Sequence, residues 1–154
     1  MIDKAIVKRL VEEKLDDKMF LVEITVNERN VINVFVDSYD GLTIEQCVNI
    51  SRHVEHSFDR EEEDFELQVS SPGLSEKFKV KEQFYKYTGR SIKLETVSES
   101  EFEGLIISAD EEGIILETTS REVPEGQKKK QLVVKQHHLI YDEIKSAKAV
   151  ISFK

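Results

Sequence analysis

Residues 65–74 read F-E-L-Q-V-S-S-P-G-L. Apolar and polar residues alternate over 65–69, which is the pattern of a half-buried β-strand. The two serines, the proline and the glycine at 70–73 then end the strand in a turn. Adjacent hydroxyl groups at this place are compatible with a nucleophile, a phosphate-binding loop, a binding surface or only a turn. The rest of the chain has to distinguish these four interpretations.

The sequence before this strand predicts two helices and a hairpin on a small sheet. Apolar residues recur at helical spacing over 2–15 and again over 43–58, and they alternate over 20–26 and 32–36. A pair of amphipathic helices packed on one face of a small sheet is an α+β arrangement. Phe20, Val22, Ile24 and Val26 are expected on one face of the first strand.

The second helix has a clear start. Thr43 followed by Gln46 is a capping-box pattern. Ile44, Cys47 and Val48 follow the helical period after it, and we expect them on the apolar stripe that packs against the sheet.

After residue 80 the pattern changes to short strands. Residues 81–88 are aromatic and predict one helical turn that joins the two halves. Five short apolar stretches follow, separated by turn residues, and a polar loop is expected over 119–130. This spacing predicts a small antiparallel barrel. The five stretches lie at 92–94, 102–107, 114–116, 132–134 and 150–152.

Charge is unevenly distributed along the 154 residues, whose formal net charge is −9. Residues 1–80 contain 10 Lys and Arg against 18 Asp and Glu, whereas residues 81–154 contain 12 against 13. The acidic first half repels nucleic acid and attracts basic partners. The second half carries its own basic cluster at Lys128, Lys129 and Lys130, which suits contact with phosphate.

Membrane insertion and secretion are not expected from the sequence. No apolar run approaches the roughly 20 residues that a spanning helix needs. The first residues include an acid and lack the apolar core of a signal peptide. These features predict a cytoplasmic protein without a membrane partner.

The residues also argue against catalysis and metal binding. Ser70 and Ser71 lack the G-x-S-x-G context of a nucleophile elbow, and no base is placed beside them by the sequence. The single cysteine, Cys47, cannot build a cysteine-based zinc site, and His53 with His56 would need further ligands. We therefore expect no catalytic residue, no metal and no cofactor.

Two signatures in order carry a family resemblance. V-D-S-Y-D-G-L-T-I-E-Q-C-V-N-I-S-R at 36–52, followed by F-E-L-Q-V-S-S-P-G-L at 65–74, resembles the bacterial ribosome maturation factor RimP family. The resemblance implies an N-terminal α/β domain over 1–80, a linker turn over 81–88 and a C-terminal SH3-like (Sm-like) β-barrel over 89–154. It also implies no enzymatic activity.

The resemblance implies a function in ribosome assembly. A member of this family is expected to bind the free small (30S) ribosomal subunit and to promote its late maturation. The expected contacts are a basic small-subunit ribosomal protein near the decoding centre and 16S ribosomal RNA. We expect a monomer. Two rivals are a general RNA-binding module that uses the barrel and, less favoured, a hydrolase that uses Ser70 or Ser71.

The candidate contacts with the ribosomal protein lie in two turns that each follow a predicted strand. Neighbouring strand ends would bring these turns together as one polar surface. Its residues are Asp37, Asp40, Gly41, Ser70, Ser71, Pro72 and Gly73.

The candidate RNA contacts are lysines. They are Lys77, Lys79, Lys81, Lys128, Lys129 and Lys130. The family pattern continues after P-G-L as D-R-P-L, whereas residues 75–78 here read S-E-K-F, so the lysines at 77–81 are expected to substitute for the missing arginine.

Overall fold

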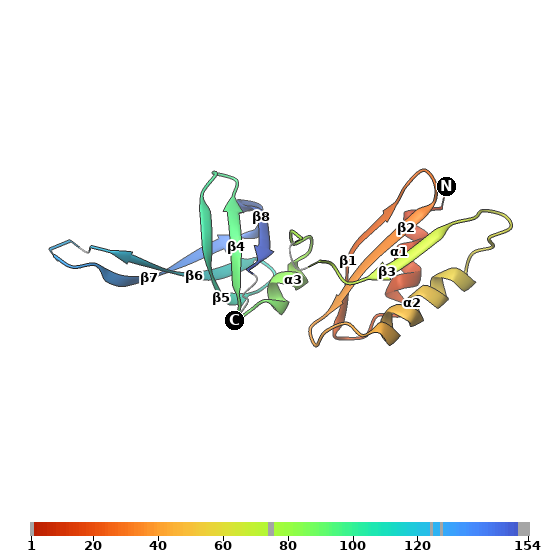
Figure 1. Cartoon of the computed structure of the whole chain (residues 1–154), viewed down its shortest axis with the longest axis horizontal. Helices are drawn as coiled ribbons and strands as arrows, with labels where there is room; N and C mark the ends of the chain where they lie inside the picture. Colours follow the sequence, from red (N-terminus) through yellow and green to blue (C-terminus); the bar gives the residue numbers. More distant parts are fainter. Residues whose placement is uncertain (1, 74–75, 124, 127, 151–154) are drawn as a thin grey trace. The chain divides into compact units, whose positions relative to one another are not determined.

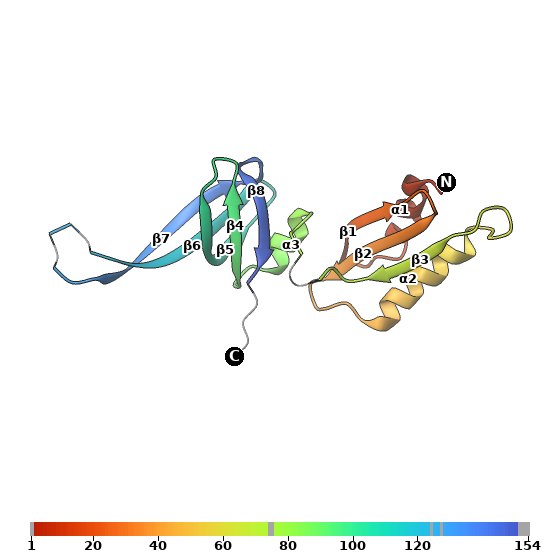
Figure 2. The same cartoon turned by 45° about the horizontal axis from the view of Figure 1, so that its top comes forward.

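The chain folds into two units in a computed structural model that describes residues 2–73, 76–123, 125–126 and 128–150 (Figures 1 and 2). Contacts divide it into Met1–Gly73 and Leu74–Lys154. Each unit has its own hydrophobic core. None of the described helices combines the length and apolar character that crossing a bilayer requires.

The first unit is a small mixed sheet with two helices, as the sequence predicts (Figure 1). Strands β1 and β2 form an antiparallel hairpin, and β3 pairs in parallel with β2, so the strand order is β1-β2-β3. The elements are α1 (Lys4–Glu12), β1 (Met19–Val26), β2 (Val31–Ser38), α2 (Ile44–His56) and β3 (Glu66–Ser70).

Both helices begin at a side-chain cap. Asp3 accepts a hydrogen bond from the Ala5 amide at the start of α1 (2.9 Å). At α2 the capping box is confirmed, because the Thr43 hydroxyl accepts from the Gln46 amide (3.1 Å) and the Gln46 side chain accepts from the Thr43 amide (2.9 Å). These bonds satisfy amide groups that would otherwise lack partners at a helix start.

The helices cover one face of the sheet. Ile32, Val34 and Val36 alternate along β2 and are fully buried in one cluster with residues of both helices, such as Val11 and Val54. Side chains two apart in a strand share a face, so α1 and α2 pack on the same side.

The prediction that Phe20, Val22, Ile24 and Val26 share one face is wrong. The pairing of β1 with β2 shifts between Leu21 and Glu23. One extra residue in a strand reverses the facing of everything beyond it. Leu21 therefore packs against the core with Ile24, whereas Phe20 packs on the Tyr39 ring at a centroid distance of 5.1 Å.

The second unit is an antiparallel sheet of five strands in the order β7-β6-β5-β4-β8. Among the described residues the two edge strands, β7 and β8, form no ladder with each other, so the pairing is that of an open sheet. The elements are α3 (Lys81–Lys86), β4 (Ser91–Thr96), β5 (Glu101–Ala109), β6 (Gly113–Glu122), β7 (Gln131–Ile140), a 3-10 turn η1 (Tyr141–Glu143) and β8 (Ile144–Ala149).

Two strand predictions need correction. Residues 119–122 belong to β6 and not to a loop, because the β6–β7 ladder continues until Glu122 pairs with Gln131. The two strands extend as a ribbon beyond the rest of the sheet (Figures 1 and 2). The fifth strand ends at Ala149, so Val150 follows it, and Ser152 lies outside the described residues.

The helical turn predicted as a linker packs into the second unit. Phe84 of α3 is buried in the second core, and its ring meets that of Phe78 edge-on at a centroid distance of 5.0 Å. The Phe78 amide also donates to the Ala147 carbonyl of β8 (2.7 Å). The aromatic residues at 78–88 thus serve the core of the second unit, and the division of the chain falls earlier than residues 81–88.

We expect Gly104→Ala to destabilise the second unit. Gly104 lies in β5 opposite Ile92, and a Cβ atom there would collide with the backbone carbonyl of Glu117. Because backbone must move, the free energy of unfolding should fall by ~1–3 kcal/mol. Amide hydrogen exchange in β5 and β6 measures this change, and Ser108→Ala at an exposed position of β5 is the control. Equal protection in both variants would contradict the prediction.

Candidate functional site

Parallel pairing brings two turns to one end of the first sheet. Phe35 of β2 lies opposite Ser70 of β3, and both strands run in the same direction. The chain therefore leaves both strands at the same end. We call residues 37–41 and 70–73 together the strand-end lip. The structure thus places the turns that contain the predicted protein contacts at one end of the sheet.

The first turn of the lip is held by its own side chains. Asp37 is 8% exposed, and its carboxylate accepts from the Ser38 amide (2.9 Å). Asp40 pairs with Lys18 (Oδ2 to Nζ, 2.8 Å), and this hydrogen bond and charge raise the pKa of the Lys18 ammonium. Gly41 has φ of +94°, a conformation that favours glycine. These interactions give the carboxylates of the lip a structural role.

The second turn of the lip borders an open groove. Ser70 is half-buried and Ser71 is exposed, and both line the groove between β3 and the start of α2. Pro72 and Gly73 follow them, and Leu74 and Ser75 lie outside the described residues. The groove is lined by Leu42, Thr43, Ile44, Cys47, Val48, Ser51, Val69, Ser70 and Ser71.

The groove corrects the expected core stripe of α2. Ile44 is 84% exposed and Val48 is 38% exposed, whereas Ile50 and Val54 further along the helix are buried. The first turn of α2 borders the end of β3, and its apolar side chains line the groove there instead of entering the core. Cys47 is only half-buried, and partial burial raises the pKa of its thiol.

The described residues offer no catalytic or metal-binding arrangement at the lip. No hydrogen bond recorded for them joins Ser70 or Ser71 to a histidine, and His53 is instead 2.8 Å from Glu13 (Nε2 to Oε2). Within the same ranges no three His, Cys, Asp or Glu side chains are grouped so that they could hold a metal ion. The lip and groove can therefore contribute shape, apolar contact and hydrogen bonds.

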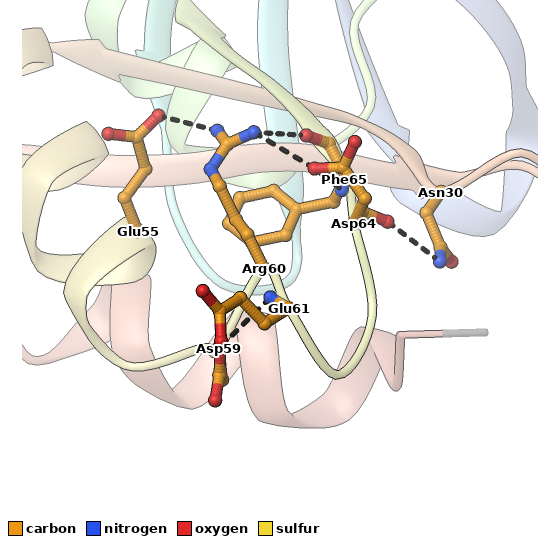
Figure 3. A network of polar contacts seen from close by, with 7 residues as sticks. All are labelled: Asn30, Glu55, Asp59, Arg60, Glu61, Asp64 and Phe65. Atoms are coloured by element: carbon orange, nitrogen blue, oxygen red, sulfur yellow. Dashed lines mark hydrogen bonds and ion pairs between the residues drawn. The ribbon is translucent and has the colours of Figure 1, made fainter.

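An acidic loop at 59–64 lies at the other end of β3, and Arg60 organises it (Figure 3). The guanidinium lies 3.1 Å from Glu55 Oε1 and 3.2 Å from Asp64 Oδ1, and it donates to the Phe65 carbonyl (2.8 Å). It also stacks 4.3 Å from the centroid of the Phe65 ring. Five residues at about 3.3 Å each separate this loop from the lip by roughly 15 Å.

The sequence-predicted lysines occupy different environments in the second unit. Lys128, Lys129 and Lys130 are exposed at the tip of the β6–β7 ribbon. Lys81 donates to the Glu111 carbonyl (2.8 Å) and lies 5.2 Å from the Tyr141 ring centroid. It therefore anchors α3 to the β5–β6 turn.

The other two lysines lie just before α3. The Lys79 amide donates to the Gln83 side chain, and Lys79 takes part in a further interaction. Lys77 lines a cavity together with Lys93 and Lys148, which sequence reasoning missed. Lys93 lies within the predicted strand at 92–94, but Lys148 lies before the fifth predicted stretch at 150–152, and the pairing of β4 with β8 that unites them was not predicted.

Comparison with known proteins gives concordant results. A model of the RimP N-terminal domain matches residues 6–75. A ribosome maturation factor RimP from Flavobacterium psychrophilum is 34% identical over 149 residues, which are 96% of each chain. The chain belongs to the RimP family. This is a family of ribosome maturation factors and not of enzymes.

Other RimP proteins match over nearly the full length. The relative from Christiangramia forsetii is 36% identical over 149 residues, covering 96% of this chain and 97% of its own. The relative from Porphyromonas gingivalis is 34% identical over 152 residues, covering 98% and 100%. The similarity therefore includes the second unit as well as the lip and groove.

We expect Arg60→Ala to loosen the acidic loop. The variant loses the stacking on Phe65 and the bond to its carbonyl, which together contribute ~1–2 kcal/mol. The exposed ion pairs add little. Amide exchange at Phe65 and Glu66 should accelerate. Arg52→Ala, at an exposed position of α2, is the control, and equal exchange in both variants would show that Arg60 does not hold the loop.

We expect Cys47 to react slowly with iodoacetamide at pH 8. Its pKa is raised by burial, so less thiolate is present at this pH than for an ordinary cysteine. The alkylation rate should still rise with pH beyond the range in which a free cysteine has levelled off. The same chain in concentrated urea provides the reference. A folded-state rate that levels off at the reference pH would contradict the assignment.

Proposed function

We propose that this chain is a non-enzymatic assembly factor that binds the free small (30S) ribosomal subunit and promotes its late maturation. The full-length similarity to proteins named ribosome maturation factor RimP supports this role. It acts in the cytoplasm as a monomer. We infer that the five-strand sheet of its second unit, whose pairing is open, curls into a partly closed SH3-like (Sm-like) barrel. The pairing of β8 with β4 supports this, since it brings the last strand beside the first.

The separation of charge between the two units carries the proposal. Met1–Gly73 contains 8 Lys and Arg against 17 Asp and Glu, a net charge of −9. Leu74–Lys154 contains 14 against 14 and is neutral. The whole excess of negative charge thus belongs to one folded unit. Such a unit attracts a basic protein and repels RNA, whereas the neutral unit can approach RNA where its lysines gather.

The first unit contacts a basic small-subunit ribosomal protein near the decoding centre. The groove and the exposed Ser71 of the lip form the contact, and Ile44 and Val48 supply exposed apolar surface that a partner side chain can cover. The acidic loop at 59–64 speeds the encounter with a basic partner by electrostatic attraction. Asp37 is buried and shapes the lip, whereas Asp40 pairs with Lys18 but keeps a side chain that is 64% exposed and can meet the partner.

The second unit contacts 16S ribosomal RNA. Lys128, Lys129 and Lys130 reach phosphates from the tip of the β6–β7 ribbon, and Lys77 and Lys79 add charge near α3. A general RNA-binding module is the alternative. A net charge of −9 on the first unit argues against it, because that charge would repel RNA that lacks a bound basic protein.

Co-sedimentation tests the function. The purified chain is mixed with free small subunits, free large subunits and intact ribosomes at two salt concentrations. Selective pelleting with small subunits is expected at both. Equal binding to all three particles that disappears at the higher salt would identify a general RNA binder. Absence from every pellet would contradict ribosome binding by this chain.

We expect Ile44→Ser with Val48→Ser to weaken subunit binding. Each apolar side chain that a partner covers contributes ~1–2 kcal/mol, so the dissociation constant should rise about tenfold or more. Stability should hardly change, because both side chains are exposed. Ile6→Ser, at a 39% exposed position of α1, is the matched control.

The same contact can be followed at Cys47, which lines the groove. Small subunits should slow its alkylation in the unsubstituted chain, and the Ile44→Ser, Val48→Ser variant should lose this protection. A folded double variant that binds as tightly as the control would remove the groove from the interface.

A further inference from the structure

Two lysines lie side by side on the outer face of the second sheet. Lys93 of β4 is directly opposite Lys148 of β8 in the antiparallel ladder, and both are exposed. Directly opposed side chains have Cβ atoms ~4.5–5.5 Å apart, so like charges there repel and destabilise the sheet. Stability alone would favour an opposite charge or a neutral residue at one of the two positions.

A third lysine reaches the same place from the segment before α3. The neighbouring Phe78 is fixed by its hydrogen bond to Ala147 of β8 (2.7 Å) and by its packing on Phe84. Lys77 is therefore held along the β8 edge. Lys77, Lys93 and Lys148, which we call the lysine cluster, line one cavity together with Ser146.

The carboxylates nearest to the cluster form no ion pair with it. Glu95 and Glu101 both line the cavity, but Glu95 pairs with Lys145 (Oε1 to Nζ, 3.8 Å), and Glu101 lies opposite Glu95 in the β4–β5 ladder. Glu103 is opposite Lys93 in the ladder, yet no ion pair joins them. Within the part of the chain that the structure describes, no member of the cluster forms an ion pair.

We propose that the lysine cluster binds a phosphate group of the ribosomal RNA backbone, an inference that rests on the RNA contact proposed for the second unit. Three ammonium groups surround the anion, and the Ser146 hydroxyl can donate a further hydrogen bond. The bound phosphate removes the repulsion between Lys93 and Lys148. The site reads no base, so it positions the second unit on RNA without selecting sequence.

The double variant Lys93→Gln, Lys148→Gln tests the site. The probe is transcribed 16S ribosomal RNA, and its affinity is measured over a range of salt concentrations. The dissociation constant should rise about tenfold near 0.1 M salt, and the log–log salt slope should become shallower by about one. The melting temperature should stay equal or rise, since the substitution relieves repulsion. The control variant is Lys8→Gln, Lys14→Gln, which makes the same change in net charge at two exposed lysines of the first unit.

The outcomes separate the site from the wider function. Affinity and slope equal to those of the control variant would overturn the site, as would a lower melting temperature with an unchanged slope. Pyrophosphate provides a second arm, because it should compete with the RNA for the unsubstituted chain. Pyrophosphate binding at the cluster without any effect of the variant on RNA affinity would identify a site for free phosphate and overturn the RNA assignment. Co-sedimentation of the unsubstituted chain tests subunit binding independently of all these results.

Discussion

The parallel pairing of β3 with β2 is the constraint on which the first unit depends. It requires a crossover between the two strands, and α2 supplies it. The same pairing puts the C-terminal ends of both strands, and the first turn of α2, at one end of the sheet. The groove therefore lies beside the lip, and the acidic loop before β3 lies at the opposite end of the sheet. One set of backbone hydrogen bonds thus places the apolar groove and the acidic loop at opposite ends of a unit of 73 residues.

The charges of the second unit sum to zero, so its electrostatic attraction for a ligand depends on where the charged side chains lie. On its outer face Lys93 lies opposite Lys148 on one side and Glu103 on the other, and Glu95 lies opposite Glu101. Opposite signs within the two like-charged pairs would have given favourable cross-strand pairs. A grouping that costs stability is the expected result when a surface is shaped by a charged ligand. At the tip of the β6–β7 ribbon, Lys128–Lys130 also group like charges, but among the described residues these lysines are exposed on an extended hairpin and line no cavity.

Local signals in the sequence predicted the elements well, and long-range pairing explains most of the errors. The capping box at Thr43 and the hairpin of β1 and β2 were predicted because their determinants lie within a few residues. The exposure of Ile44 was not, since helical spacing cannot show where the sheet beneath the helix ends. The face of Phe20 depended on a bulge, and the length of the β6–β7 ribbon depended on a partner strand. For the candidate site, the placement of the two turns at one end of the sheet was foreseeable, whereas the lysine cluster needed the order of β4, β8 and the segment at Phe78.

The absence of a base beside Ser70 and Ser71 in the described structure answers the question that these serines raise. A hydroxyl becomes a nucleophile only when a proton acceptor lies within hydrogen-bond reach. Here the serines border a groove whose other walls are largely apolar, so they form its polar edge. An apolar contact on one unit is little affected by salt, whereas phosphate contacts on the other weaken steeply with it. Two modest contacts on one chain reinforce each other through effective concentration, provided that both can engage at once. Under the proposed function, selectivity for a particle that presents a basic protein beside RNA would follow from this combination, because neither unit alone would need high affinity.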